Sequence, residues 1–255
     1  MRVRSKKRGC LSWILFAASL IFFVLAVREY TPFVVNDIRM DQLQKEVILP
    51  EKEIKDKEIP KWASRRIDWE KLQKTNPDIV AWIVVPGTKI DYPVLRCDKW
   101  NEYLYKDYEG EFSKPGSIFI QPETEEDFSD FHTILFGHNM RNKSMFGSLH
   151  SYEKESFWRK HRKIYIYQPG KATRYRIFAA YDCRDGSETY RTEYKDEEAR
   201  KEWISMVRKE SYFSVKDAVR TGDHILTLST CSNGGPRSSR YVVHSLEREV
   251  ITNDE

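Results

Sequence analysis

The feature that most restricts this chain is an uncharged, mostly apolar run near its N-terminus, from Cys10 to Val27. The run is 18 residues long, and as a helix rising about 1.5 Å per residue it would reach about 27 Å, close to the thickness of a membrane's hydrocarbon core. Five basic residues precede it, namely Arg2, Arg4, Lys6, Lys7 and Arg8. Because basic residues stay on the cytoplasmic side, the sequence predicts a single-pass anchor at residues 10–27, with the tail 1–9 inside the cell and everything after Arg28 outside.

A cleaved signal peptide is the alternative for this segment. Val24 and Ala26 loosely resemble the small residues of a cleavage site, but the apolar run is long and no clean A-x-A pattern follows it, which favours a retained anchor. The basic residues before the run also supply the formal net charge of +4, because the rest of the chain is close to neutral. The charge balance therefore gives no reason to expect a nucleic-acid partner.

The segment after the anchor, residues 28–61, has the composition of a polar spacer. From Asp41 to Glu58 it mixes Lys and Glu with scattered Leu, Val and Ile, and Pro50 and Pro60 interrupt it. This pattern predicts helical stalk segments of modest stability, a tether that lifts the following domain off the bilayer. Since 40% of the chain is hydrophobic, residues 62–255 can bury the core of one globular domain.

Eight short runs of apolar and β-branched residues in this domain predict strands. The predicted strands are Ile79–Val85, Lys89–Leu95, Ser117–Gln121, Thr133–Phe136, Lys163–Gln168, Ala172–Tyr181, His224–Thr230 and Tyr241–Val250. Pro86-Gly87 and Pro169-Gly170-Lys171 have the turn chemistry of hairpin connections. Because the strands are short and mostly sequential, a mostly β fold built as an antiparallel barrel is favoured.

Helices are expected at three places in the domain. Asp68 stands where it can cap a short helix that Asn76-Pro77 would end. Met145–Arg162 is an aromatic and basic insertion of helical character. Asp196–Lys209 carries an apolar stripe at helical spacing, formed by Ala199, Trp203, Met206 and Val207. The stripe predicts a helix that packs against the barrel as ordinary core.

The stretch Ile225–Glu247 combines a strand-loop-strand pattern with reactive side chains. An apolar and β-branched run leads to Cys231, Ser-Asn-Gly-Gly-Pro breaks the chain, and Tyr241–Val243 restarts it. Cys231 therefore ends one strand, and Arg240 begins the next strand nine positions later. If the two strands are neighbours, a nucleophilic thiol and a permanently charged guanidinium meet at the same end of a sheet.

A proton donor and acceptor for this pair lies upstream, in FHTILFGHNM. There a β-branched run ends at Gly137 and presents His138 at its tip. Cysteine, histidine and an anion-stabilising arginine together are a constellation for acyl transfer.

The segments that carry these three residues, LFGHNM, TLSTC and SSRYVVHSL, resemble the sortases in residue type and in the order His, Cys, Arg. Within the sortases they resemble class B, together with NPDIVAWIVVPGTKIDYPVL, GSIFI and KSMFGSL, so the likeness runs from about residue 67 to residue 250. It implies an eight-stranded sortase-type β-barrel with N-terminal helices and a helix inserted before the cysteine strand, where class A sortases have a loop.

The resemblance also implies an activity, that of a membrane-anchored cysteine transpeptidase. Cys231 would attack a C-terminal sorting motif of a secreted protein after its Thr and form a thioester, His138 would act as general acid and base, and Arg240 would stabilise the oxyanion or hold the substrate. An amino group of the peptidoglycan precursor or cross-bridge would resolve the thioester. No metal and no cofactor is implied. The substrate contacts implied are Leu104, Ser229, Thr230 and Tyr190.

Two other functions remain as alternatives. Another cell-wall cysteine transpeptidase, of the L,D-transpeptidase type, also runs His, Cys, Arg, but its pattern S-x-G-C followed two residues later by Arg is absent, since Thr230 and Asn233 occupy those positions. A non-catalytic, membrane-tethered binding module would have an incidental cysteine. A thiol probe that labelled Cys231 no faster than Cys97 would favour that module.

The other candidate sites are weaker. Cysteines 10, 97, 183 and 231 form no C-x-x-C pair, which argues against a zinc site, and Cys97 and Cys183 fit small buried residues with a mutual disulfide as the alternative. The acidic loop at 123–130 lacks EF-hand spacing, so a solvated loop is favoured over a calcium site. The histidines at 132, 224 and 244 are interpreted as strand residues with satisfied ring nitrogens.

Overall fold

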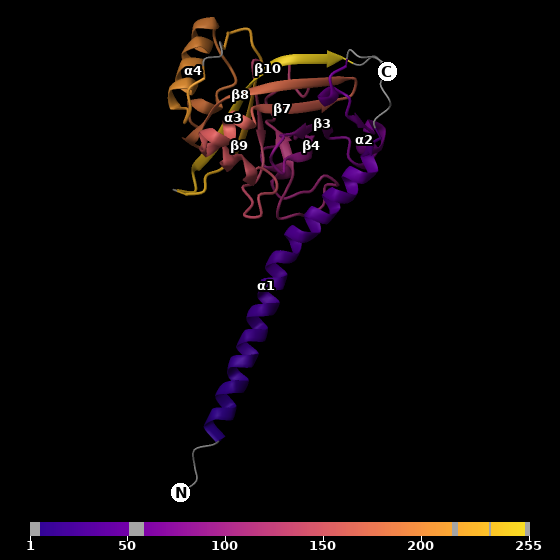
Figure 1. The fold of residues 1–255 in the computed structure, drawn as a ribbon, viewed down its shortest axis with the longest axis vertical. Coiled ribbons are helices and arrows are strands. Elements are labelled where there is room, and N and C mark those ends of the chain that lie inside the picture. Colours follow the sequence, from indigo (N-terminus) through magenta and orange to yellow (C-terminus); the bar gives the residue numbers. More distant parts are fainter. Residues whose placement is uncertain (1–5, 51–58, 216–218, 235, 253–255) are drawn as a thin grey trace.

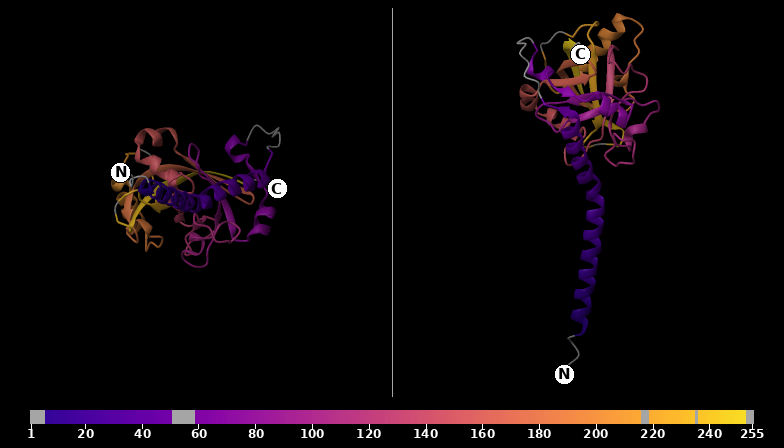
Figure 2. Two further views of the ribbon diagram at one scale, coloured as in Figure 1. Left: turned by 90° about the horizontal axis from the view of Figure 1, so that it is seen from below. Right: turned by 90° about the vertical axis from the view of Figure 1, so that its right-hand side faces the viewer.

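The computed structural model describes residues 6–50, 59–215, 219–234 and 236–252, with the backbone alone for residues 6–11. A long N-terminal helix projects from a domain that is built around a β-barrel (Figure 1). Figure 2 shows the same arrangement from two further directions, and its right-hand view shows the domain at one end of the helix.

The predicted eight-stranded barrel is confirmed. Its strands are β3 (Ile79–Val84), β4 (Asp91–Leu95), β5 (Ile118–Ile120), β6 (His132–Phe136), β7 (Lys163–Gln168), β8 (Lys171–Arg184), β9 (Ile225–Cys231) and β10 (Ser239–Thr252). The barrel closes in the order β10-β8-β7-β3-β4-β5-β6-β9. Each predicted strand overlaps one observed strand, as expected for short apolar and β-branched runs that are bounded by turn residues.

The expectation of an antiparallel barrel is wrong at two places. β4 pairs with β5 in parallel, and β6 pairs with β9 in parallel. Long connections separate both pairs in the sequence, and such connections allow the chain to cross the barrel and start the next strand in the same direction. The β7–β8 connection, in contrast, is a hairpin turn as expected. It is formed by Pro169 and Gly170 alone, with Gly170 at a φ of 65°, because Lys171 already belongs to β8.

The remaining elements surround the barrel. They are α1 (Lys6–Val47), β1 (Ile48–Leu49), η1 (Lys61–Ala63), β2 (Arg66–Ile67), α2 (Trp69–Thr75), η2 (Glu102–Leu104), η3 (Gly147–Glu153), α3 (Glu155–Lys160), η4 (Glu188–Tyr190) and α4 (Glu197–Glu210). Asp68 caps α2 as predicted, because its side chain accepts a hydrogen bond from the Lys71 backbone N–H at 3.0 Å. The insertion predicted at Met145–Arg162 forms η3 and α3.

Helix α4 precedes β9 and packs on the outside of the barrel. Asp196 caps it, and the predicted stripe supplies its buried face, with Ala199, Trp203 and Val207 buried and Met206 partly buried. These side chains meet residues of β8, β9 and β10 that point outward from the barrel, among them Val242. Strand alternation places Tyr241, next to Val242, in the interior core.

Helix α1 runs without a break through the predicted anchor and Pro32 into the expected stalk. Its last turns pack onto the domain, where Met40, Leu43 and Val47 are buried, and β1 then pairs with β2. The spacing of these three residues forms one helical stripe, a signal that the Lys and Glu content of the segment obscured. The part of the stalk at residues 36–49 is therefore attached to the domain, while residues 51–58 lie outside the described structure.

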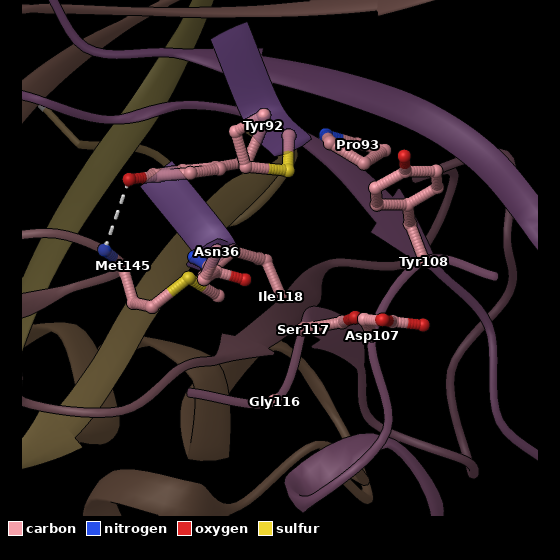
Figure 3. Close-up of a pocket in the computed structure, with 10 residues that line it drawn as sticks. Asn36, Tyr92, Pro93, Asp107, Tyr108, Gly116, Ser117, Ile118 and Met145 are labelled. Atoms are coloured by element: carbon pink, nitrogen blue, oxygen red, sulfur yellow. Dashed lines mark hydrogen bonds between the residues drawn. The ribbon is translucent and has the colours of Figure 1, made fainter. Parts of the chain in front are cut away.

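A small pocket lies at the interface between α1 and the barrel (Figure 3). Asn36 and Met40 of α1 line it together with Tyr92 and Tyr108 of the domain. The Tyr92 hydroxyl accepts a hydrogen bond from the Met145 backbone N–H at 3.2 Å, which Figure 3 shows as a dashed line. At this interface α1 therefore packs against β4 and against the segment that follows β6.

Candidate active site

Cys231 and Arg240 lie directly opposite each other at one end of the barrel. β9 and β10 are antiparallel neighbours, and Arg240 is the register partner of Cys231. Opposite residues of two paired strands point to the same face, so the thiol and the guanidinium share a face. Cys231 is exposed, and Arg240 is only partly so.

The guanidinium of Arg240 is held by three oxygen atoms. Its Nη2 pairs with the carboxylate of Asp185 at 2.7 Å, and its Nη1 donates to the backbone oxygens of Arg237 at 2.8 Å and Ser239 at 3.3 Å. The other arginine of the loop, Arg237, has an exposed side chain. The structure therefore gives Arg240 a defined orientation at the start of β10.

His138 reaches the same end of the barrel through β6. Phe136 is the register partner of Ser229, so the parallel pairing places position 138 level with position 231. The His138 Nε2 donates a hydrogen bond to the Leu104 carbonyl at 2.8 Å, and the ring lies 5.4 Å from that of Tyr105. Burial lowers the pKa of His138, which favours the neutral imidazole.

Comparison with known proteins agrees with this geometry. The profile of the Sortase domain matches residues 83–247. The chain belongs to the sortase family. It is 32% identical over 178 residues to sortase B of Staphylococcus aureus (strain NCTC 8325 / PS 47), a match that covers 70% of this chain and 73% of that protein.

Solved structures place this sortase in class B. The Staphylococcus aureus sortase B–substrate complex aligns with a TM-score of 0.67 and 31% identity over 71% of this chain and 84% of that one. A sortase B complexed with triglycine aligns with a TM-score of 0.66 and 31% identity over 73% of this chain and 86% of that one. The protein is therefore a sortase B-type cysteine transpeptidase with the expected sortase-type barrel, and α4 is the helix expected before the cysteine strand.

The predicted substrate contacts of this sortase all lie around the three residues. Ser229 and Thr230 are buried and hydrogen-bonded, Ser229 with the Tyr190 hydroxyl at 2.8 Å and Thr230 as a donor to the Gly137 carbonyl at 2.7 Å. Leu104 contacts His138 through its carbonyl. Burial raises the pKa of Tyr190. Whether these four residues bind substrate stays a prediction.

Sequence patterns did not reveal a group of polar residues beside Cys231. Asn139 donates from Nδ2 to the Cys231 carbonyl at 2.9 Å, and His150 Nε2 lies 2.9 Å from the same oxygen. Glu153 lies 2.7 Å from the other ring nitrogen of His150. The i, i+3 spacing of His150 and Glu153 was the available signal, whereas nothing local connects Asp185 with Arg240.

The cysteines of this sortase have contrasting environments. Burial raises the pKa of Cys97 to about 12 and also raises that of Cys183. Both are free thiols, so the alternative disulfide between them is not formed. Among the three cysteines whose side chains are described, Cys231 is the exposed thiol.

Proposed function

We propose that this sortase is a membrane-anchored transpeptidase that cleaves a C-terminal sorting motif of secreted proteins after Thr and transfers them to an amino group of peptidoglycan. Cys231 is the nucleophile, His138 the general acid and base, and Arg240 the donor to the oxyanion. The observation that best supports the proposal is the register of β6, β9 and β10, which brings these three side chains to one end of the barrel.

The first half-reaction forms the acyl-enzyme. Neutral His138 takes the thiol proton of Cys231, and the sulfur attacks the carbonyl carbon of the peptide bond after Thr. Negative charge develops on the carbonyl oxygen, where the guanidinium of Arg240 donates N–H bonds. His138 then gives its proton to the departing amine, the C–N bond breaks, and a thioester remains on Cys231.

The second half-reaction releases the protein. An amine of the peptidoglycan precursor or cross-bridge attacks the thioester, and His138 accepts the proton of that amine. The C–S bond breaks as the new amide forms, and the proton returns to the sulfur of Cys231. By analogy, the solved sortase B complex with a substrate supports a sorting-motif protein as the first substrate, and the complex with triglycine supports an amine as the second.

The proposed topology follows from α1. Part of this helix is long and apolar enough to cross a membrane, and the large apolar side chains at 13–27 are exposed. The basic tail before it favours a cytoplasmic N-terminus. The catalytic domain then lies outside the cytoplasmic membrane, where secreted proteins and peptidoglycan are available.

Thioester trapping tests the proposal. The full-length chain in detergent micelles is incubated with a peptide library that covers LPxTG-like and NPxTN-like motifs, and the protein mass is measured before an amine is added. We expect an added acyl mass on Cys231 that an oligoglycine amine removes. The variant Cys231→Ala keeps the fold, because an exposed strand-end thiol contributes little packing, and it forms no adduct. Turnover above background in that variant would exclude a covalent cysteine mechanism.

A further inference from the structure

Helix α1 holds one loop of the domain next to the end of its apolar run. The run ends at Val27, and Glu29 follows two residues later on the same helix. The Glu29 carboxylate lies 2.9 Å from the ammonium group of Lys114. Lys114 belongs to the segment 105–117 that joins η2 to β5, called the 105–117 loop below. This loop therefore contacts α1 just beyond the apolar run.

The height of this contact above a bilayer follows from helix geometry. Two residues of an α-helix rise about 3 Å, so Glu29 lies about 3 Å beyond the end of the apolar run. The headgroup layer on each side of a bilayer is roughly 5–7 Å thick, half the difference between the full thickness and the hydrocarbon core. If the apolar run crosses the hydrocarbon core, the ammonium group of Lys114 lies within the headgroup layer.

Two residues before Lys114, the same loop exposes an aromatic ring. Phe112 is 77% exposed, the highest value among the large hydrophobic side chains that the structure describes. Its Cα lies within about 7 Å of that of Lys114, because two residues cannot span more. Tyr30 of α1, which follows Glu29, is also exposed. Exposed aromatic rings beside charged groups are typical of segments that lie at a membrane interface.

The 105–117 loop is held in shape by hydrogen bonds. The Asp107 carboxylate accepts from the backbone N–H groups of Glu109 and Glu111 at 3.0 Å each, and it pairs with Arg39 of α1 at 2.8 Å. The Ser113 backbone N–H donates to the Tyr105 carbonyl at 2.9 Å, across the loop. The exposed ring therefore has a defined position relative to α1.

The charges of the 105–117 loop nearly cancel. The loop carries two lysines and three carboxylates, namely Lys106, Lys114, Asp107, Glu109 and Glu111. Arg39 of α1 adds a positive charge, 2.8 Å from Asp107 and 3.9 Å from Glu109. A contact with a bilayer would therefore depend on the apolar ring and would not require anionic lipids.

We propose that the 105–117 loop lies on the membrane surface, with the ring of Phe112 inserted among the lipid headgroups. The partner is the bilayer that holds α1, so this inference rests on the anchor of the proposed function. Tyr105 of the same loop has its ring 5.4 Å from that of His138. The candidate active site is then held close to the bilayer, whereas the sequence predicted a spacer that lifts the domain away from it.

Photocross-linking from position 112 tests the contact. p-Benzoylphenylalanine replaces Phe112 in the full-length chain, which is reconstituted in vesicles of phosphatidylcholine and illuminated. Mass spectrometry then identifies the molecule attached to the chain. We expect a phosphatidylcholine adduct at position 112.

Two other positions serve as controls for the photoprobe. In place of Phe22, an exposed side chain inside the apolar run, it should give a phosphatidylcholine adduct. In place of Val250, which is 39% exposed, it should give none. Val250 lies near the end of β10, and Figure 1 shows that end on the side of the domain away from the projecting part of α1.

The outcomes separate this inference from the anchor itself. A lipid adduct at position 22 without one at position 112 would overturn the inference and leave the anchor intact. No lipid adduct at position 22 would refute the anchor, and this inference with it. A cross-link from position 112 to a second copy of the chain, in place of lipid, would assign the ring to a protein contact and also overturn the inference.

An insertion in α1 tests whether this helix sets the height of the loop. Seven polar, helix-forming residues between Val27 and Arg28 would raise the domain by about 10 Å, more than the thickness of the headgroup layer. We expect the lipid adduct at position 112 to be lost and the adduct at position 22 to remain. An unchanged urea midpoint would show that the domain is folded. A lipid adduct at position 112 that persists in this folded variant would contradict a contact set by α1.

Discussion

Arg240 and Arg237 both follow the nucleophile, but only Arg240 has the environment that an oxyanion donor needs. Arg240 is the second residue of β10, and its guanidinium contacts the carboxylate of Asp185 and two backbone oxygens. Arg237 lies within the loop, and its side chain is exposed. A donor that is already ordered loses less of its effect when charge develops on the substrate.

We expect Arg240→Ala to lower peptide cleavage by about a hundredfold to a thousandfold, the usual effect of removing one preorganised oxyanion donor. Arg240→Lys should recover only part of this loss, because lysine lacks the planar fork that reaches several oxygens at once. The cleavage rate of Arg237→Ala should stay within roughly a few fold of the wild-type rate, because the removed side chain is solvated. This variant keeps the backbone oxygen that accepts from Arg240. The measurement is steady-state cleavage of a sorting peptide.

The outcome that contradicts this assignment is an inactive Arg237→Ala with an active Arg240→Ala. The catalytic arginine would then have to be reassigned to the loop. Arg240→Ala also removes the partner of Asp185, so its unfolding should be measured beside its activity.

Among the elements, α1 differs most from its expected role as a tether. It contacts the two loops that flank His138, one from η2 to β5 and the other after β6. The contacts are Lys114 with Glu29 at 2.9 Å, Asn142 with Asp37 at 3.2 Å and Arg39 with Asp107 at 2.8 Å. Leu104, whose carbonyl accepts a hydrogen bond from His138, ends η2 directly before the first of these loops. Docking of α1 therefore stabilises the two loops that surround His138, the proposed acid and base.

Arg39→Ala is expected to destabilise the domain by about 1 kcal/mol, because the buried carboxylate of Asp107 loses its charged partner. The loss is limited, since Arg39 is almost half exposed and solvent screens the pair. Glu46→Gln is the control on the same helix, because its pair with Lys71 is exposed and should contribute less than about 0.5 kcal/mol. Urea unfolding of the full-length chain, followed by tryptophan fluorescence, measures both. Equal midpoints for the two variants would show that α1 docks without this pair.

For the whole molecule, stability should depend on pH through two histidines inside the domain. Thr227 Oγ1 lies 2.7 Å from a ring nitrogen of His132 and 2.7 Å from one of His244. Both rings also contact Trp203 of α4, so the group lies between the barrel and this helix. Burial lowers the pKa of His132 to about 4 and lowers that of His244 well below its usual range. Both rings are therefore neutral in the folded protein, with satisfied nitrogens as the sequence predicted.

Acid should consequently weaken the fold. The unfolded chain binds protons at these histidines below about pH 6.5, while the folded chain resists them, so stability falls as the pH drops from about 6.5 toward 4. For His132 alone the full loss is on the order of 3 kcal/mol. Urea midpoints at pH 7 and pH 5 should differ for the wild type and differ less for His132→Gln. Identical wild-type midpoints would show that the folded domain accepts these protons freely.

The whole molecule is also expected to be held at a membrane. Because the apolar part of α1 has the length and the basic flank of a retained anchor, the full-length chain should fractionate with membranes. Detergent should release it, and high salt should not. A mature N-terminus near Arg28 in a soluble extracellular fraction would instead support the cleaved signal peptide.

Local sequence patterns were enough to predict the helices and strands of this domain and to select three candidate catalytic residues, His138, Cys231 and Arg240. Apolar alternation between turn residues located all eight barrel strands, Asp196 and a helical stripe located α4, and the strand-loop-strand pattern put Cys231 opposite Arg240. These signals depend on side-chain periodicity and turn chemistry within a few residues. They are therefore readable before the fold is known.

Only the tertiary structure decided which distant segments meet. The parallel pairing of β6 with β9 makes His138 level with Cys231, and His150 approaches the Cys231 carbonyl from 81 residues away. Asp185 reaches Arg240 across 55 residues. Such contacts follow from strand order and register around a closed barrel. Those depend on how the whole core packs, which no short stretch of sequence encodes.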